Sequence, residues 1–169
     1  PSLAQIAPLP IIEFDFDYPG EPSLDHLSFF PLQGLRLSQS NLTSFSKLER
    51  FNLRKLHLDG VDASDFESLE VHPLIELSLR RTKVDSLHFL NNSAIELLYL
   101  SQTAINDQEL EYLQDKPLKS VDLFKCPVSN LSPVCQENLE EIVISGSQVE
   151  DLTPLSECPL RKLEMRATK

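Results

Sequence analysis

Apolar residues recur along the chain in a fixed pattern. The segment from Leu74 to Val84 has the skeleton L-x-x-L-x-L-x-x-T-x-V. We find the same leading skeleton at eight starts: Leu9, Leu32, Leu53, Leu74, Ile95, Leu118, Leu139 and Leu160. Successive starts lie 21 or 23 residues apart, and a constant period in this range indicates an array of stacked units. We therefore expect residues 1–169 to form one domain of eight units, the last of them incomplete.

The pattern inside one unit predicts its local structure. The last two apolar positions of L-x-x-L-x-L alternate with a variable residue, which predicts a short strand with one buried face. Each unit buries its apolar ridge only against its neighbours, so the strands should stack in parallel. Apolar residues then follow at every third position, as at Val84, Leu87 and Leu90. This spacing favours a 3-10 or extended return segment over an α-helix.

Two units, starting at Leu9 and Ile95, are two residues longer than the others. The extra residues favour a helical turn in each, over Pro22–Leu27 and Asp107–Leu113. The ninth position of a unit mostly carries a side chain that can bond to the turn backbone. The ninth residues are Asp17, Ser40, Val61, Thr82, Thr103, Cys126, Ser147 and Thr168. Val61 lacks such a group, so its turn should be the least regular.

These features resemble the leucine-rich repeat family, over essentially the whole chain and most weakly over residues 1–20. The segments Val128–Val134 and Val149–Leu155 resemble the V-x-D-L-x-P-L segment of short bacterial repeats, including the internalin type. One departure is that Asn, usual at the ninth position of internalin units, is absent there. The resemblance implies an α/β-type solenoid with a curved parallel sheet on its concave face. It also implies mostly 3-10 or extended returns, with one or two short helices, on the convex side.

The openings Pro73-Leu74, Pro117-Leu118 and Pro159-Leu160 add a finer resemblance. They are similar to arrays that accompany serine/threonine protein kinases in planctomycete and lentisphaera-type bacteria. The present sequence has no glycine-rich loop, H-R-D or D-F-G, so no kinase chemistry is carried over and no catalytic residue is predicted. The chain begins at Pro1 without a basic-then-apolar leader, and its last unit stops after the strand. We expect a piece of a longer bacterial protein, either cytoplasmic or extracytoplasmic.

Composition narrows the classes of partner. A formal net charge of -11 disfavours nucleic acid, because binding phosphate requires a cationic face. No run reaches the roughly 18 apolar residues of a transmembrane helix, so we expect no membrane insertion. The spacing of cysteines and histidines fits no zinc site, and we predict neither metal nor cofactor. For Cys126, Cys135 and Cys158 the first interpretation is three reduced thiols; a Cys135–Cys158 bridge is the alternative.

The resemblance implies that a partner binds the concave sheet face, and the repeat predicts which residues line it. The middle of this face gathers arginine, lysine and aromatic side chains, the types that anchor protein interfaces. The predicted partner-binding residues are Arg36, His57, Arg80, Arg81, Tyr99, Asp122, Phe124 and Lys125. They favour a protein or peptide ligand, with an acidic segment as one candidate. The alternative is a solvated sheet face with scattered long side chains.

Three functions are compatible with this sequence. The first is a non-catalytic protein–protein interaction scaffold. The second is the regulatory or sensing region of a larger bacterial serine/threonine protein kinase, and the third is a cell-surface adhesin or carbohydrate-binding module. His57, Asp59 and Ser78 superficially offer a catalytic triad, but outward ladder positions supply neither a deep pocket nor an oxyanion site. We expect a monomer whose terminal strand edges can pair end to end.

Overall fold

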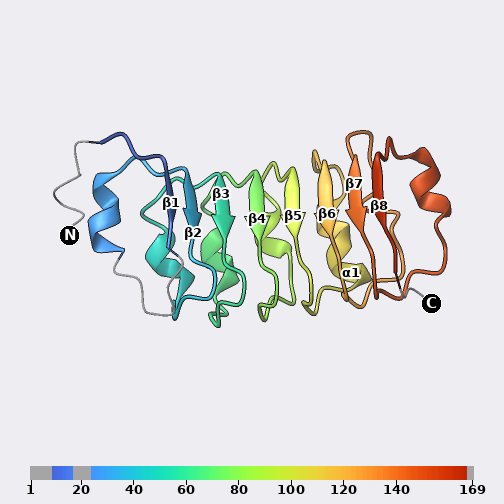
Figure 1. Cartoon of the computed structure of the whole chain (residues 1–169), viewed down its shortest axis with the longest axis horizontal. Helices are drawn as coiled ribbons and strands as arrows, with labels where there is room; N and C mark the ends of the chain where they lie inside the picture. The colour runs from blue at the N-terminus through green and yellow to red at the C-terminus, as the bar shows by residue number, and fades with distance from the viewer. Residues whose placement is uncertain (1–8, 17–23, 167–169) are drawn as a thin grey trace.

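The structure, a computed structural model, describes residues 9–16 and 24–166. Within them, eight three-residue strands form one parallel sheet whose spatial order is the chain order (Figure 1). The strands are β1 Glu13–Asp15, β2 Gly34–Arg36, β3 Lys55–His57, β4 Glu76–Ser78, β5 Leu97–Tyr99, β6 Ser120–Asp122, β7 Glu141–Val143 and β8 Lys162–Glu164. This order follows from the repeat, because each unit adds one strand beside the previous one.

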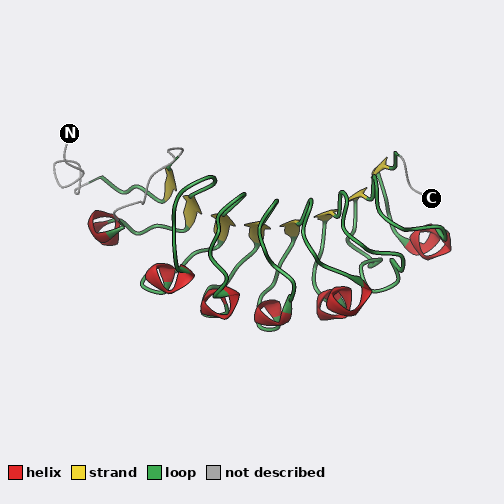
Figure 2. Cartoon of the chain, turned by 90° about the horizontal axis from the view of Figure 1, so that it is seen from below, coloured by secondary structure: helices red, strands yellow, loops and turns green. Residues whose placement is uncertain are grey.

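The strands line the inner side of an arc, and the helical segments lie on its outer side (Figure 2). Among the described residues, one return segment holds a short α-helix, α1 Asp107–Leu110, which continues as a 3-10 turn over Glu111–Leu113. Other returns contain 3-10 helices: Asp25–Phe29, Phe45–Leu48, Phe66–Leu69, His88–Leu90 and Thr153–Glu157. The predicted solenoid, with a concave parallel sheet and mostly 3-10 or extended returns, is therefore confirmed. No helix in residues 9–16 or 24–166 is long and apolar enough to cross a membrane.

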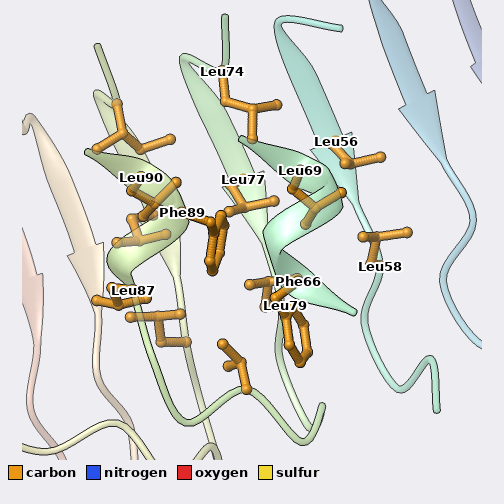
Figure 3. Packing of buried hydrophobic residues seen from close by; sticks show 14 of the residues in the cluster. Leu56, Leu58, Phe66, Leu69, Leu74, Leu77, Leu79, Leu87, Phe89 and Leu90 are labelled. Carbon is orange, nitrogen blue, oxygen red and sulfur yellow. The ribbon is translucent and has the colours of Figure 1, made fainter. Parts of the chain in front are cut away.

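The core lies between the sheet and the return segments. Leu77 and Leu79 of one unit are fully buried, and so are Leu87 and Leu90 of its return. Side chains from the returns point toward those of the strands (Figure 3). Phe45 and Phe66 contact each other across units, with tilted rings whose centroids are 5.1 Å apart. Equivalent residues therefore contact one another between units, and this contact stabilises the stack rather than any single unit.

The turn after each of the strands β2–β7 holds one residue in the left-handed region. In successive units these residues are Gln39, Gly60, Arg81, Gln102, Lys125 and Gly146, with φ between 56° and 73°. Their backbone N–H groups continue the ladder: that of Arg81 donates to the carbonyl of Ser101, and that of Lys125 to the carbonyl of Ser145, both at 2.9 Å. Arg81 and Lys125 therefore occupy corner positions at the edge of the concave face.

The first unit is out of the expected register. Phe14 lies opposite Leu35, which makes Ile11 the start of this unit, whereas the sequence suggested Leu9. Leu9 is 51% exposed, while Ile11 and Phe16 pack against the core. The prediction was wrong by two residues because two overlapping sets of apolar residues have the same spacing. The first unit is thus 21 residues long, and Phe16 is partly buried against the core.

The turn at Val61 is regular, contrary to the prediction that it would be the least regular. The Val61 amide donates to the Leu58 carbonyl at 3.1 Å, the same bond that Ser40 makes to Leu37. Thr82 and Thr103 add hydroxyl bonds to carbonyls, at 2.7 and 2.8 Å. The Val61 turn is therefore regular, because the backbone bond does not require a polar side chain. The expected roles of Asp17 and Thr168, and the start of the Pro22–Leu27 turn, lie outside the described residues.

The interpretation of three reduced thiols is wrong. Cys135 and Cys158 form a disulfide between the returns of successive units, with Cα atoms 5.6 Å apart. The two cysteines lie two positions apart in the returns of neighbouring units, and the direct stacking of these units brings them within disulfide distance. Cys126 remains a buried free thiol, and burial raises its pKa. It donates to the Leu100 carbonyl at 3.1 Å, so it contributes to packing.

Candidate functional site

Two hollows occupy the concave face. The N-terminal hollow, about 320 Å³, lies over β1–β4 and is lined by Glu13, Phe14, Asp15, Gly34, Leu35, Arg36, Lys55, His57 and Glu76. The C-terminal hollow, about 590 Å³, lies over the region from β4 to β8. Its lining residues are Arg80, Tyr99, Ser101, Ser120, Asp122, Phe124, Lys125, Glu141, Val143, Ser145, Gly146, Lys162, Glu164 and Arg166. Both are shallow and open, as expected for a curved sheet surface.

Arg80 is held in place at one end of the C-terminal hollow. Its Nε donates to Asp122 Oδ2 at 3.1 Å, and its guanidinium lies 4.5 Å from the ring centroid of Tyr99. The Asp122 carboxylate also accepts from the Ser101 hydroxyl at 2.6 Å and from the Phe124 amide at 3.0 Å. Because all its partners lie within the chain, Asp122 organises the site. It is also only 9% exposed, so most of its surface faces its own chain, and its predicted contact with a partner would be small.

A second carboxylate completes this network. Asp59 accepts from the Ser78 hydroxyl and from the Arg80 amide, and lies 4.0 Å from the Arg80 guanidinium. Arg80 is thus enclosed by two carboxylates that are 14% and 13% exposed. Charge-assisted bonds of this kind fix a side chain in one geometry. The hollow therefore has a preorganised wall formed by Arg80 and the Tyr99 ring beneath it.

The apolar part of the C-terminal hollow comes from Tyr99, Phe124 and Val143, all half-buried. They project from β5, from the turn after β6 and from β7, so they form a patch across three units. Burial raises the pKa of Tyr99, and the nearby Glu76 carboxylate adds to this. The Tyr99 hydroxyl consequently stays protonated at neutral pH and can donate a hydrogen bond to a bound group.

Three cations at the strand-end edge lack an ion pair among the described residues: Arg81, Lys125 and Arg166. All three are exposed. The Lys125 ammonium lies 5.1 Å from the Phe124 ring centroid, beside the apolar patch. The carboxylates in the hollow are engaged elsewhere: Glu164 and Glu141 lie 2.8 and 4.0 Å from Lys162. The charge open to a ligand at this edge is therefore positive, although the whole chain is acidic.

In the N-terminal hollow, the charges are paired with one another. Arg36 Nε lies 3.1 Å from Asp15, Lys55 Nζ lies 3.0 Å from Glu13, and His57 Nε2 lies 2.8 Å from Glu76. The two predicted site residues here, Arg36 and His57, therefore face carboxylates of their own chain. An outside carboxylate would have to displace these partners before it could bind.

The eight predicted residues thus fall into two groups. Arg80, Tyr99, Asp122, Phe124 and Lys125 line the C-terminal hollow, and Arg36 and His57 line the N-terminal one. Arg81 lines neither hollow and lies in the turn next to Arg80. Sequence reasoning missed the outward residue before the fourth position of each unit, including Lys55, Glu76 and Glu141. Strand alternation places these residues on the same face, so a stricter use of period two would have found them.

Chemistry at His57, Asp59 and Ser78 is not supported by their geometry. The Ser78 side chain is fully buried and its hydroxyl donates to Asp59, while His57 is bonded to Glu76. A triad requires the serine hydroxyl to bond to the histidine, whereas Ser78 bonds to Asp59 and His57 bonds to Glu76. Within residues 9–16 and 24–166, no group of three or more His, Cys, Asp or Glu residues could hold a metal ion.

Comparison with known proteins identifies the fold. No family model matches the sequence, and no curated protein matches it. The internalin inlF of Listeria monocytogenes superposes with a TM-score of 0.72 at 24% identity, over 84% of this chain and 43% of that one. The internalin C2 of the same species superposes with a TM-score of 0.70 at 18% identity, over 97% of this chain and 84% of that one. The chain spans less than half the length of the first internalin, and this likeness shows the fold, a leucine-rich repeat solenoid.

Proposed function

We propose that this chain is a non-catalytic scaffold that binds a protein or peptide on its concave face. The observation that carries the proposal is the C-terminal hollow, where an apolar patch adjoins a preorganised wall and cations that have no ion pair among the described residues. Aromatic side chains beside arginine are the usual centre of a protein interface. A network that is already formed in the free chain reduces the ordering cost of binding.

The most informative residues for this function are Tyr99 and Phe124. Both are half-buried, so their backbones and inner ring edges are fixed while their outer surfaces remain open. Such rigid aromatic groups offer contact area at a small loss of side-chain freedom. Arg80 and Asp122 position them, and Lys125 and Arg81 supply charge at the rim.

The test is selection of a random displayed peptide library against the immobilised chain. Selected clones are then measured on two double variants, Tyr99→Ala/Phe124→Ala and Arg36→Ala/His57→Ala. We expect the first to lose more than about tenfold in affinity, and the second to bind almost normally. Thermal unfolding of both variants controls for the fold. Failure to select any clone that depends on Tyr99 and Phe124 would contradict the proposal.

The other two hypotheses are regulation of a larger kinase and binding of a surface carbohydrate. A carbohydrate site would require more outward aromatic side chains than Tyr99 and Phe124, and each of these already has a cation over one face. A kinase context rests on the resemblance of the repeat openings alone. Neither is favoured by a contact in the described structure.

A further inference from the structure

We infer that the ligand of the C-terminal hollow is an acidic segment in a polyproline-II-like conformation, running across the strands with a carboxylate at every third residue. This inference rests on the proposed function and specifies its partner. The carboxylates would contact Arg81, Lys125 and Arg166, while an apolar side chain of the same segment packs on Tyr99 and Phe124.

The sign of the partner's charge follows from which groups are already paired. Over β4–β8, the cations at the start of the strands have partners: Lys119 lies 2.7 Å from Glu96, and Arg161 lies 3.6 Å from Glu140. At the opposite, strand-end edge, Arg81, Lys125 and Arg166 have no carboxylate within ion-pair distance among the described residues. Unpaired charge therefore lies on one side of the hollow and favours a negative ligand there.

The spacing of the ligand's carboxylates follows from the period of the solenoid. Arg81 and Lys125 hold the same corner position in units whose strands, β4 and β6, are separated only by β5. Parallel strands are about 4.8 Å apart, so these two cations lie in units about 9.6 Å apart. Arg166 follows β8 and lies one residue earlier in its unit, at the position that Arg80 holds after β4. The corner positions after β5 and β7 hold the uncharged Gln102 and Gly146.

The distance between these cations indicates the backbone conformation of the bound segment. A polyproline II helix has three residues per turn and rises about 3.1 Å per residue, so every third side chain lies on one face about 9.3 Å from the last. In a β-strand, residues three apart point to opposite faces. In an α-helix, residues three or four apart are only about 5–6 Å from each other. Of the regular conformations, polyproline II therefore matches the cation spacing best.

The apolar patch fixes where the segment lies. Val143 and Phe124 adjoin Lys125, so a side chain next to the central carboxylate reaches them. The ligand is then held by an apolar anchor on one side and by charges on the other. This arrangement gives the bound segment one preferred orientation across the strands.

The experiment uses the same random peptide library and reads the sequences of the selected clones. We expect Asp or Glu at positions i and i+3, often also i+6, near an apolar residue, and affinity that falls at high salt. The double variant Arg81→Gln/Lys125→Gln should lower affinity by about tenfold, because two rim charges are lost. Gln is suitable because Gln39 and Gln102 already occupy the same left-handed corner in this chain.

The matched control is Arg36→Gln/Lys55→Gln, which also removes one Arg and one Lys but from paired sites in the N-terminal hollow. It should leave affinity unchanged. Clones that require Tyr99 and Phe124 but lack the three-residue acidic spacing, or that bind Arg81→Gln/Lys125→Gln normally, overturn this inference and leave the proposed function intact. Absence of any clone that requires Tyr99 and Phe124 overturns both.

Discussion

The two hollows of the concave face contain similar residues but differ in how those residues are used. In the N-terminal hollow, Arg36, Lys55 and His57 each lie within 3.1 Å of a carboxylate of the same chain. In the C-terminal hollow, Lys125 and Arg166 have no such partner among the described residues, and Tyr99 and Phe124 provide apolar area. The comparison shows that the charge available to a ligand is set by the contacts within the face. A count of basic residues does not reveal it.

The largest predicted effect is the loss of stability when the disulfide is reduced. This bond joins the return segments that follow β6 and β7. Reduction of Cys135–Cys158 should lower the free energy of unfolding by about 3 kcal/mol, because the bond closes a loop of 23 residues in the unfolded chain. Denaturant unfolding with and without reductant measures this. Amide exchange should rise around β6–β8 and not around β2–β4. A Cys135→Ser/Cys158→Ser variant should be insensitive to reductant; sensitivity there would contradict the assignment.

The next prediction compares the nearly buried Arg80–Asp122 pair with the exposed Arg36–Asp15 pair. Asp122→Ala should destabilise the chain by about 2 kcal/mol, because Arg80, the Ser101 hydroxyl and the Phe124 amide all lose a partner. Asp15→Ala removes a carboxylate that is 63% exposed, and such a surface pair contributes less than about 1 kcal/mol. Urea unfolding of the two variants tests the comparison. Equal losses would mean that the Arg80 network is no more organised than the Arg36 pair.

Much of this was accessible from the sequence. The repeat predicted the strands, their parallel order and the 3-10 returns, since leucines at fixed spacing can be buried only by stacking. It did not fix the register of the first unit, where Leu9 and Ile11 begin equally good patterns. Nor could the repeat show that Asp122 bonds to Arg80. Strand alternation predicts only on which face of the sheet a side chain lies, and not which neighbour it contacts. The pairing of Cys135 with Cys158 likewise depended on a distance between units.

Acidification should weaken the N-terminal half more than the C-terminal half. His72 is buried, and burial lowers its pKa below the ordinary 6.5; the Phe51 backbone and the Glu49 charge oppose this without reversing it. As the pH falls, His72 therefore binds a proton more readily in the unfolded chain than in the folded one. Stability is consequently lost as the pH falls below about 6.5. We expect a loss on the order of 1 kcal/mol by one pH unit lower, measured by denaturant titration at several pH values.

Substitution of His72 by a neutral residue provides the control for this pH effect. His72→Leu should flatten the dependence of stability on pH between neutrality and mild acid. Amide exchange should show the acid-induced opening around β3 and β4, since His72 lies in the return between them. Opening that begins around β7 and β8 would contradict the expectation.

The smallest predicted effect is that of Lys125→Gly, which should change stability and peptide affinity in opposite directions. Lys125 adopts a φ of 56°, a conformation that costs a non-glycine residue about 1 kcal/mol. Lys125→Gly should therefore raise stability by up to about 1 kcal/mol while it lowers affinity for a selected acidic peptide. Thermal unfolding and fluorescence anisotropy measure the two quantities on one variant. A stability gain with unchanged affinity would remove Lys125 from the site.

The most direct test of the account is to locate a selected peptide on the concave face by hydrogen–deuterium exchange of the chain with and without it. We expect protection to be concentrated on β5–β7 and their following turns, from Tyr99 to Gly146, and β1–β3 to exchange as in the free chain. Protection centred on Asp15, Arg36 and His57 would show that paired charges do not exclude a ligand, and would contradict the central claim.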